Sequence, residues 1–510
     1  MIACLGEARR GEARMLRNRP DWTEKGSRGV GYQTVVHVKG ARDKDTKQLV
    51  LSRNAVSVLR PGRARVEPDD EFVVDAVFGQ ETTASEVAKN AVRPLVSKLV
   101  SGENVFVYLL GATETSKTDL LEGDGEGNAS NLVDLAAAEV FRALGAKNRD
   151  VSDFLATARD QGQAGRGQQY DFFVESRFAE IYDERCRDLY APAGQNEVAL
   201  AEDEHEGFRL QGQVRKTCSD AGELSGDYAR GLSNRDKRLT DIGGAEERTA
   251  TLFSVSVDQL VPHSAFSRGS GTHGSQTSPQ DPSRQPAAEP KRPPVHLKST
   301  LTFVNLPGAE RLVMDPEVLR AREGVSLNKG LLTFAQCLRR LGSGETGPGT
   351  DFLAEESALT RLTQDGLGGN ANCLVIGTLK TDARNDWQQN LATMRYLSLA
   401  RRARTFPCCN DGATRAILRG LRARLMHLKE QRESLSEHLK DVPAFGDVDA
   451  GANYAAKLHQ MERLLMEEKE RWVAFPDRPP HFPSRLLVLH EELTEYFFLS
   501  FRSKLAGQVR

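Results

Sequence analysis

Residues 33 to 406 alternate between two patterns of apolar and polar positions. Short apolar runs rich in Val, Leu and Phe are typical of buried strands, and the stretches between them place apolar residues three and four positions apart, as helices do. Because strands and helices follow one another in turn, the pattern favours an α/β layer architecture with a largely covered sheet. The expected strands are 34–38, 72–78, 105–110, 170–181, 251–257, 301–306 and 373–379, and the expected helices are 85–99, 132–144, 324–341 and 388–404.

Outside this core the composition of the chain changes. Residues 1–32 hold arginines interrupted by acidic residues, and we interpret them as a flexible basic tail. Residues 262–294 are rich in Ser, Gly, Pro and Gln and cannot bury enough apolar surface to fold alone, so we expect a disordered surface loop. We therefore divide the chain into the tail, a globular domain over 33–406 and a helical region over 407–510.

The helical region begins with leucines at mostly three- and four-residue spacings, which predicts an amphipathic helix over 414–440. A seam this short allows either a weak homodimeric coiled coil or a helix that docks back on the globular domain, and we slightly favour docking or a helical hairpin over dimerisation. Further helices are expected over 454–472 and 484–505. The leucines of the seam are Leu418, Leu421, Leu425, Leu428, Leu435 and Leu439.

Composition narrows the functional classes. The chain has 510 residues, 39% of them hydrophobic and 27% charged, so it is long enough to bury a sizeable core. The net charge of -2 gives no general attraction to nucleic acid, and no uninterrupted apolar run approaches the length of a membrane span. Seven cysteines without C-x-x-C pairs argue against zinc and for a reducing compartment, so we expect a cytoplasmic or cytoskeletal protein.

An altered phosphate-binding loop follows the apolar run 105–110. In the pattern G-x-x-x-x-G-K-[ST], glycines let backbone N–H groups surround phosphate, the lysine reaches the outer phosphates and the hydroxyl binds Mg²⁺. Gly111, Lys117 and Thr118 keep this pattern, with Thr118 as the candidate Mg²⁺ ligand, but Ser116 replaces the second glycine. The candidate ATP or ADP site consists of Gly111, Ala112, Thr113, Glu114, Thr115, Ser116, Lys117 and Thr118.

The remaining polar features indicate no further chemistry. The acidic run 202–206 is most simply a solvated loop. The ten histidines form no constellation with Asp, Glu or Cys at the spacing of metal ligands.

Six sequence motifs occur in the order found in kinesin motor domains, so the chain resembles a kinesin. They are the segments 72–78, 111–118, 178–189, 305–311, 327–331 and 359–370. The resemblance covers residues 33–406 and implies a central, mostly parallel sheet flanked by helices, with nucleotide on one side and a tubulin-binding face on the other. It also implies that the region after residue 404 stands where a kinesin has its neck.

Compared with the kinesin pattern, the phosphate loop carries two side chains in place of glycines, Glu114 and Ser116. If Glu114 lies about 6 Å from a phosphate charge, their repulsion at an effective dielectric constant of about 20 is about 3 kcal/mol. The adenine-side motif of the family is replaced by the segment 37–40. These changes weaken the predicted affinity for nucleotide.

The two switch segments of the family are altered as well. Glu246 and Glu247 replace the serines that in kinesins face the γ-phosphate and the Mg²⁺ shell. Asn305 replaces the carboxylate that holds the water shell of the metal. The glycine that senses the γ-phosphate and the ion pair that closes the two switches are kept, as Gly308 and as Arg248 with Glu310.

The face that the resemblance places against tubulin has lost part of its charge. Glu355 and Ala358 replace basic residues of the kinesin pattern, which weakens electrostatic steering toward an acidic filament. The candidate microtubule face keeps Lys329, Arg339, Arg340 and Arg361.

Two functional interpretations from different classes follow. The preferred one is a kinesin-like pseudomotor, a structural or scaffolding protein that binds microtubules or an associated cytoskeletal or axonemal assembly and has lost or weakened ATP hydrolysis. The alternative is a divergent ATP-dependent microtubule motor that holds MgATP through Lys117 and Thr118. A regulator locked to ADP lies between them, and the sequence leaves cytoplasmic and ciliary filaments both open.

Overall fold

The computed structural model describes most of the chain between residues 29 and 430. The described residues are 29–39, 49–60, 70–79, 81–112, 115, 117–123, 131–160, 169–192, 194–241, 249–269, 293–308, 322–343, 356–381, 386–420, 422–423, 426–427 and 430. The segments expected as helices over 454–472 and 484–505 lie outside these ranges, as do most of the predicted tail and of the insert 262–294.

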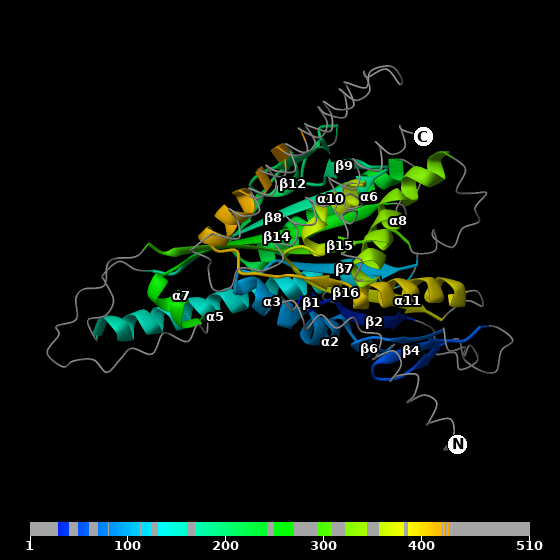
Figure 1. Ribbon diagram of the computed structural model, residues 1–510, viewed down its shortest axis with the longest axis horizontal. Coiled ribbons are helices and arrows are strands. Elements are labelled where there is room, and N and C mark those ends of the chain that lie inside the picture. The colour runs from blue at the N-terminus through cyan, green and yellow to red at the C-terminus, as the bar shows by residue number, and fades with distance from the viewer. Residues whose placement is uncertain are drawn as a thin grey trace, which may run out of the picture.

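A ten-stranded sheet forms the centre of the molecule (Figure 1). Its strands are β2 (Gln33–Lys39), β6 (Ala76–Phe78), β7 (Val105–Gly111), β8 (Asp171–Tyr182), β9 (Arg185–Asp188), β10 (Glu197–Val198), β13 (Lys216–Cys218), β14 (Ala250–Val261), β15 (Val295–Asn305) and β16 (Asn372–Lys380). The strand order is β10-β9-β8-β14-β15-β7-β16-β2-β6, and β13 pairs with β8. The expected strands are therefore present, except that the one expected over 72–78 is divided into β5 (Glu71–Val73) and β6, of which only β6 belongs to this sheet.

The predicted α/β class is confirmed, but the sheet is mixed rather than mostly parallel. The four pairings that join β15, β7, β16, β2 and β6 are parallel, whereas the five pairings among β10, β9, β8, β13, β14 and β15 are antiparallel. β14 and β15 alone pair over eleven positions, from Thr251↔Asn305 to Val261↔Val295. Apolar runs report burial and not strand direction, so the sequence pattern does not reveal the antiparallel half.

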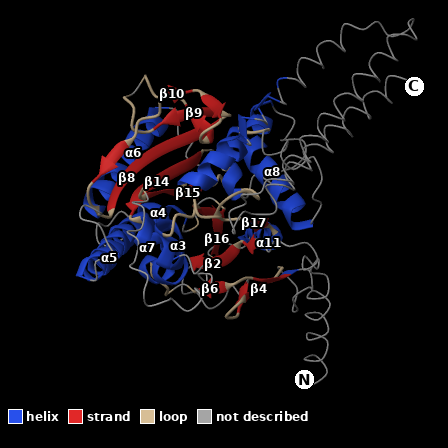
Figure 2. Ribbon diagram, turned by 60° about the vertical axis from the view of Figure 1, so that its left-hand side comes forward, coloured by secondary structure: helices blue, strands red, loops and turns tan. Residues whose placement is uncertain are grey.

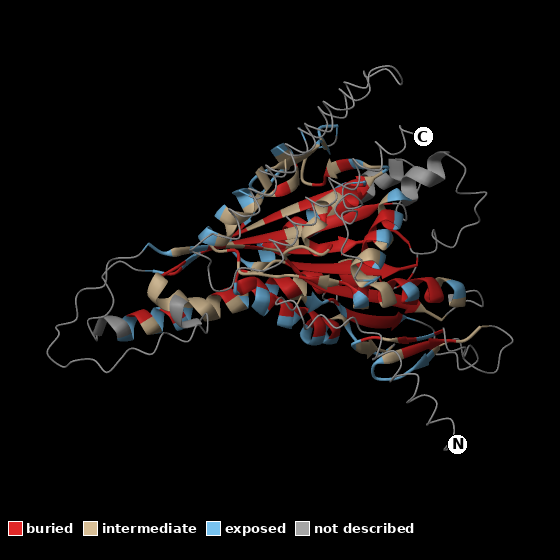
Figure 3. Cartoon of the chain, in the orientation of Figure 1, coloured by how far each residue is buried: buried red, intermediate tan, exposed pale blue. Residues whose placement is uncertain are grey.

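Helices cover both faces of the sheet (Figure 2). One face carries α2 (Ala84–Val87), η3 (Ala88–Val92), α3 (Arg93–Val100), α4 (Lys117–Glu122), α5 (Leu132–Asp160) and α6 (Ala221–Asp241), and the other carries α8 (Arg322–Ser343), α10 (Ala358–Leu362) and α11 (Asp386–Arg402). Each face has its own hydrophobic core. Along β7, Val105, Val107 and Leu109 pack under the helices of the first face, while Phe106, Tyr108 and Leu110 pack under those of the second. Since strand side chains alternate between faces, a strand covered on both sides reads as one continuous apolar run, and Figure 3 shows the central strands buried along their length.

Helix α6 is the largest element that the sequence pattern did not predict. It contains three glycines, which lower helix propensity and dilute the apolar periodicity. A Cβ at Gly231 would lie 2.3 Å from Cδ1 of Phe178 on β8, so this glycine permits the close packing of α6 on the sheet. The predicted helix 132–144 is also longer in the structure, because α5 continues to Asp160.

Small sheets and short helices decorate the central layers. They are the pair β1 (Val30–Gly31) and β17 (Arg404–Thr405), the sheet β3 (Leu49–Leu51), β4 (Ala55–Val58) and β5 (Glu71–Val73), the hairpin β11 (Leu200–Asp203) and β12 (Gly207–Leu210), and the helices α7 (His263–Gly269) and η7 (Gln364–Gly366).

Three of these elements correct predictions. The strand predicted over 72–78 is two strands, β5 paired with β4 and β6 paired with β2, and between them the Asp75 carboxylate accepts a hydrogen bond from the Thr34 N–H (2.7 Å). Residues 30 and 31, which we assigned to the tail, form β1, and residues 263–269 of the expected disordered insert are helical.

After β17 the chain stays on the globular domain. The Phe406 N–H donates to Gly369 O (2.9 Å), the Asn410 N–H donates to Gly102 O (2.8 Å), and the Lys298 N–H donates to Asn410 O (3.1 Å). A helix then begins, with residues 412–420 helical throughout; we refer to it as the C-terminal helix. In Figure 1 this helix lies beside the β11–β12 hairpin, so its first turns dock on the globular domain as we predicted. Each helix in the described ranges is too short or too polar to cross a membrane.

Candidate functional site

The phosphate loop leaves the sheet at Gly111, the last residue of β7. A Cβ at Gly111 would lie 2.0 Å from Oγ1 and 2.7 Å from the carbonyl oxygen of Thr378, its partner on β16. Thr115 is buried and its hydroxyl donates to Ala112 O (2.7 Å), within 2.6 Å of the Thr378 hydroxyl. The loop is therefore folded tightly against β16. Thr113, Glu114 and Ser116 lie outside the described residues.

Lys117 begins α4 and is buried, with 7% of its surface exposed. Its Nζ donates a hydrogen bond to Leu306 O (3.2 Å), so the ammonium group reaches from the phosphate loop to the end of β15. Thr118, the next residue, is exposed. The structure thus places the candidate phosphate lysine and the candidate metal ligand at the same corner of the sheet.

The segment that replaces the adenine-side motif is connected to the same helix. Lys39, the last residue of β2, forms an ion pair with Asp119 of α4. Nε2 of His37 lies 3.2 Å from Thr82 O, and burial lowers the pKa of this imidazole. The ion pair joins β2 to the helix that follows the phosphate loop, and its two side chains are 46% and 40% exposed.

Asn305, the last residue of β15, lies beside this corner with 8% of its surface exposed. The N–H of the following residue, Leu306, donates to Leu109 O (3.0 Å) and continues the parallel pairing with β7. Oδ1 of Asn305 is buried, and no described residue offers it a hydrogen bond. Gly308, three positions after Asn305, is also buried. Of the other candidate switch residues, Glu246, Glu247, Arg248 and Glu310 lie outside the described residues.

A buried arginine on α6, which the sequence analysis did not single out, supports this corner. Arg235 of α6 lies 3.0 Å from Glu122 of α4 and 3.9 Å from Glu180 of β8. Glu180 is fully buried and Arg235 is 5% exposed. Glu180 stands among apolar residues of β8, and this was the sequence signal for the ion pair, since a buried carboxylate requires a cationic partner.

Comparison with known proteins now decides the family. The profile of the kinesin motor domain matches residues 37–404. The chain belongs to the kinesin motor-domain family. Chromosome-associated kinesin KIF4 from Mus musculus is 25% identical over 406 residues, which cover 79% of this chain and 29% of that protein. Kinesin-like protein KIF27 from Homo sapiens is 25% identical over 351 residues, or 68% of this chain and 22% of that protein. This chain therefore spans less than a third of the length of these kinesins.

Solved kinesin structures share the fold. A fast kinesin superposes with a TM-score of 0.57 at 17% identity, covering 75% of this chain and 94% of that one. A KIF14 dimer bound to AMP-PNP and a microtubule superposes with a TM-score of 0.56 at 18% identity, covering 77% of this chain and 100% of that one. The kinesin fold that the resemblance implied is thus confirmed.

The described residues fit a kinesin nucleotide in part. Lys117, which is buried, and Thr118, which is exposed, would hold the phosphates and Mg²⁺ of ATP, and the nucleotide would supply the γ-phosphoryl group for hydrolysis. The orphaned oxygen of Asn305 is an acceptor suited to a metal-bound water, but it carries no negative charge. Elsewhere in the described ranges, no group of three or more His, Cys, Asp or Glu side chains is placed to hold a metal ion.

The cations of the candidate microtubule face come from two elements. Lys329 and Arg339 are exposed on α8 and Arg340 is half-buried there. The α8 and α10 helices pack closely, since a Cβ at Gly330 would lie 3.4 Å from Cβ of Leu359. Arg361 on α10 points instead toward the hairpin, with its guanidinium 5.6 Å from the centre of the Phe208 ring. Three of the four predicted cations therefore lie on α8, whereas Arg361 contacts the β11–β12 hairpin.

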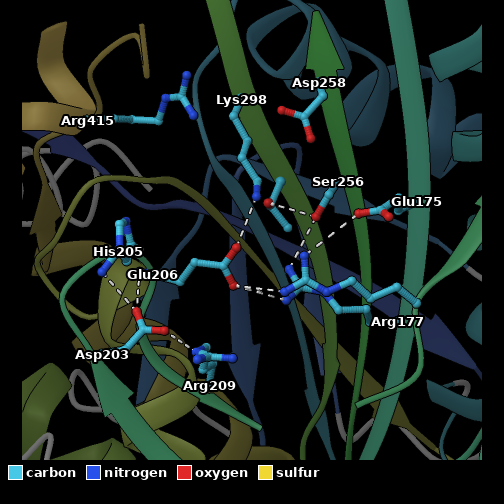
Figure 4. A network of polar contacts seen from close by, with 12 residues as sticks. Glu175, Arg177, Asp203, His205, Glu206, Arg209, Ser256, Asp258, Lys298 and Arg415 are labelled. Atoms are coloured by element: carbon cyan, nitrogen blue, oxygen red, sulfur yellow. Dashed lines mark hydrogen bonds and ion pairs between the residues drawn. The ribbon is translucent and has the colours of Figure 1, made fainter. Parts of the chain in front are cut away.

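A second charged cluster lies over the opposite half of the sheet (Figure 4). We interpreted residues 202–206 as a solvated loop, but Glu206 points inward from the turn of the β11–β12 hairpin. Its carboxylate is 3.0 Å from Lys298 and 3.6 Å from Arg177. Burial alone would raise the pKa of Glu206, but Lys298 and Arg177 outweigh it and hold the pKa below its ordinary value. A run of acidic letters does not show that one of them meets cations from two distant strands.

Proposed function

We propose that this protein is a microtubule-binding member of the kinesin family in which ATP turnover is weak or lost, and that it serves as a scaffold on microtubules. Family membership supports the fold and a filament-binding face. The residues at the nucleotide corner argue against efficient hydrolysis. The location proposed with this function is the microtubule cytoskeleton.

The observation that carries this proposal is the neutral side chain of Asn305 at the end of β15. It lies next to Leu306, whose carbonyl oxygen accepts the hydrogen bond of Lys117, and so borders the position of the phosphates. At about 5 Å and an effective dielectric constant of about 20, the attraction between a carboxylate and a divalent cation is about 7 kcal/mol before desolvation. An amide forgoes this attraction, so Mg²⁺ and its water shell are held more weakly.

The test is equilibrium binding of a fluorescent ATP analogue to the full chain, with and without Mg²⁺. We expect weak binding with little dependence on Mg²⁺. The variant Asn305→Asp restores the carboxylate and should raise Mg²⁺-dependent affinity by about tenfold, the size expected when a group that orients the metal shell is restored. Lys117→Ala is the control that removes the phosphate contact and should abolish any binding at this loop.

A divergent ATP-dependent motor is the second candidate, because Oδ1 of Asn305 has no hydrogen-bond partner among the described residues and Thr118 is exposed, so both could serve the metal. This candidate predicts micromolar, Mg²⁺-dependent binding to the unmodified chain and ATP turnover stimulated by microtubules. Finding both would replace the scaffold proposal. The double variant Glu114→Gly with Ser116→Gly separates the causes, since a gain in affinity would assign the defect to the loop rather than to Asn305.

Filament binding is tested separately through the exposed cations of α8. The variant Lys329→Glu with Arg339→Glu should reduce co-sedimentation with microtubules, most strongly at low salt, because long-range attraction to an acidic filament is screened by ions. The matched control is Arg93→Glu with Arg142→Glu, two exposed arginines on the helices of the other face. Equal binding of both double variants would reject α8 as the filament face.

Homodimerisation through 414–440 stays a prediction. Leu418, the first leucine of the predicted seam, already lines a cavity against the globular domain. Sedimentation of the full chain over a range of concentrations measures whether the remaining seam pairs two copies.

A further inference from the structure

A cavity of about 190 Å³ lies between the sheet and the C-terminal helix, and no residue of the candidate nucleotide site lines it. One face of β7, β8, β14 and β15 forms its floor. The β11–β12 hairpin, η7 and the C-terminal helix form its walls, as the hairpin and strands of Figure 4 show in part. Segments far apart in the sequence therefore enclose one space.

The floor of this cavity is polar, which is unusual for a sheet face that other elements cover. The register places Arg177, Ser254, Thr302 and Phe106 in one row across four strands. The hydroxyls of Ser254 and Thr302 lie 3.1 Å apart, and the hydroxyls of Thr300 and Thr302 both line the cavity. Each hydroxyl can form more hydrogen bonds than the one it shares with its neighbour, so the floor favours a polar occupant.

Positive charge prevails on the cavity wall. The cations are Arg177, Arg209, Lys298, Arg415 and Arg422, and the carboxylates are Glu206 and Asp365. Five cations thus face two carboxylates.

Internal pairing leaves part of this positive charge in excess. Lys298 and Arg177 share the carboxylate of Glu206 with Arg215, while Asp203 pairs with Arg209. Among the described residues, Arg415 pairs with no carboxylate: its Nη2 donates to His296 O (3.2 Å) and lies 2.9 Å from His296 Nδ1. Nε of Arg415 is buried, and no described residue accepts a hydrogen bond from it. An acceptor in the cavity would satisfy this donor.

We propose that this cavity binds a small organic anion, a phosphate or carboxylate carried on a single ring or a short apolar chain, between the sheet and the C-terminal helix. The volume supports one ring with a charged group, since a cavity of about 150 Å³ accommodates benzene. Arg415, Lys298 and Arg177 take the anion by charge-assisted hydrogen bonds. Phe106, Leu252 and Leu418 provide the apolar part of the lining.

The site is completed by the C-terminal helix, so binding is coupled to docking of that helix. Arg415, Leu418 and Arg422 lie three and four positions apart and share one helix face. Arg422 donates to His205 O (2.7 Å) and lies 3.7 Å from Asp365, which fixes this face against the hairpin and η7. A ligand that contacts both parts stabilises the docked helix, and the docked helix raises the affinity for the ligand by the same factor.

Phenyl phosphate, benzoate, inorganic phosphate and phenol, titrated calorimetrically into the full chain, test this proposal. We expect phenyl phosphate or benzoate to bind with a Kd of roughly 1 mM or below, and inorganic phosphate and phenol to bind more weakly. The stronger of the two ring anions identifies the charged group as phosphate or carboxylate. Arg415→Gln and Lys298→Gln should each weaken binding about tenfold or more, because each removes a charged hydrogen bond. Hydrogen exchange of amides 412–420 should slow when the anion is bound.

Two controls make the result decisive. Arg142→Gln removes an exposed arginine on α5 and should leave binding unchanged. Lys117→Ala should also leave it unchanged, which separates this cavity from the nucleotide loop. The proposal is overturned if neither ring anion binds at about 10 mM. It is equally overturned if binding is lost in Lys117→Ala but kept in Arg415→Gln, or if the exchange of amides 412–420 does not respond.

Discussion

The corner at the end of β7 and the cavity beneath the C-terminal helix use the same sheet in different ways. At the corner, one continuous segment supplies the loop, its lysine and its hydroxyl, and the neighbouring strand adds Asn305. At the cavity, side chains come from four strands, a hairpin, a short helix and the C-terminal helix. The difference teaches that a site carried by one segment can be recognised from sequence, whereas a site assembled by tertiary contacts needs the structure.

Conformation dominates at the corner, so the largest expected effect there comes from a single methyl group. Gly111→Ala places a Cβ 2.0 Å from Thr378 Oγ1 and 2.7 Å from its backbone oxygen, which forces β7 and β16 apart. We expect a loss of about 3 kcal/mol in the free energy of unfolding, measured by urea denaturation.

The matched control for that substitution is Gly226→Ala in α6, where no atom lies within 4 Å of the added Cβ. It should stabilise the protein by about 0.5–1 kcal/mol, because alanine is the better helix former. Equal stabilities of the two variants would show that the close approach at Gly111 is not a constraint.

Charge dominates at the cavity, and Glu206→Gln tests it. The variant leaves Lys298 and Arg177 without their carboxylate and should lower stability at pH 7 by about 1–2 kcal/mol. Glu206 has a lowered pKa in the folded protein, so its contribution is complete above the ordinary value of 4.5 and is lost as pH falls through the folded value. The difference between wild type and variant should therefore be constant above pH 5 and shrink below about pH 4.5.

Glu204→Gln in the same turn is the control, because the Glu204 side chain is half exposed and forms an ion pair with the neighbouring, exposed His205. Urea denaturation as a function of pH should show almost no change for this variant. If Glu206→Gln keeps its full deficit at pH 3, the deficit arises from packing and not from charge.

A smaller effect is expected where the C-terminal helix meets the globular domain. Arg422→Gln removes the ion pair with Asp365 and should speed hydrogen exchange of amides 412–420 about fivefold, which corresponds to about 1 kcal/mol. Burial raises the pKa of Asp365 and Arg422 opposes this effect, so the carboxyl should titrate at higher pH in the variant. Arg419→Gln on the exposed side of the same helix is the control and should leave exchange unchanged.

The smallest effect is expected at the surface of the nucleotide corner. Lys39→Gln breaks the ion pair with Asp119, in which the two side chains are 46% and 40% exposed. Solvent screening limits the loss of stability to below about 0.5 kcal/mol, and added salt should reduce it further. A loss above about 1 kcal/mol by urea denaturation would mean that this pair holds the phosphate loop in place.

Sequence reasoning succeeded where the signal was local. The apolar run of β7, the loop that follows it and the leucine spacing near Leu418 each lie within one segment, and the structure has a strand, a tight turn and a docked helix there. It failed at α6, whose glycines serve packing against Phe178, and at the acidic run, whose last residue meets Lys298 and Arg177. In both cases the partners lie in other segments of the chain: Phe178 is 53 positions from Gly231, and Arg177 and Lys298 are 29 and 92 positions from Glu206.

The sequence by itself determined the α/β class, the family resemblance and the altered chemistry of the phosphate loop, because period, residue type and motif order are properties of neighbouring letters. Tertiary structure alone decided the antiparallel half of the sheet, the inward position of Glu206 and the cavity that the C-terminal helix completes. The physical reason is that strand direction, burial and charge pairing depend on which distant segments come together when the chain folds.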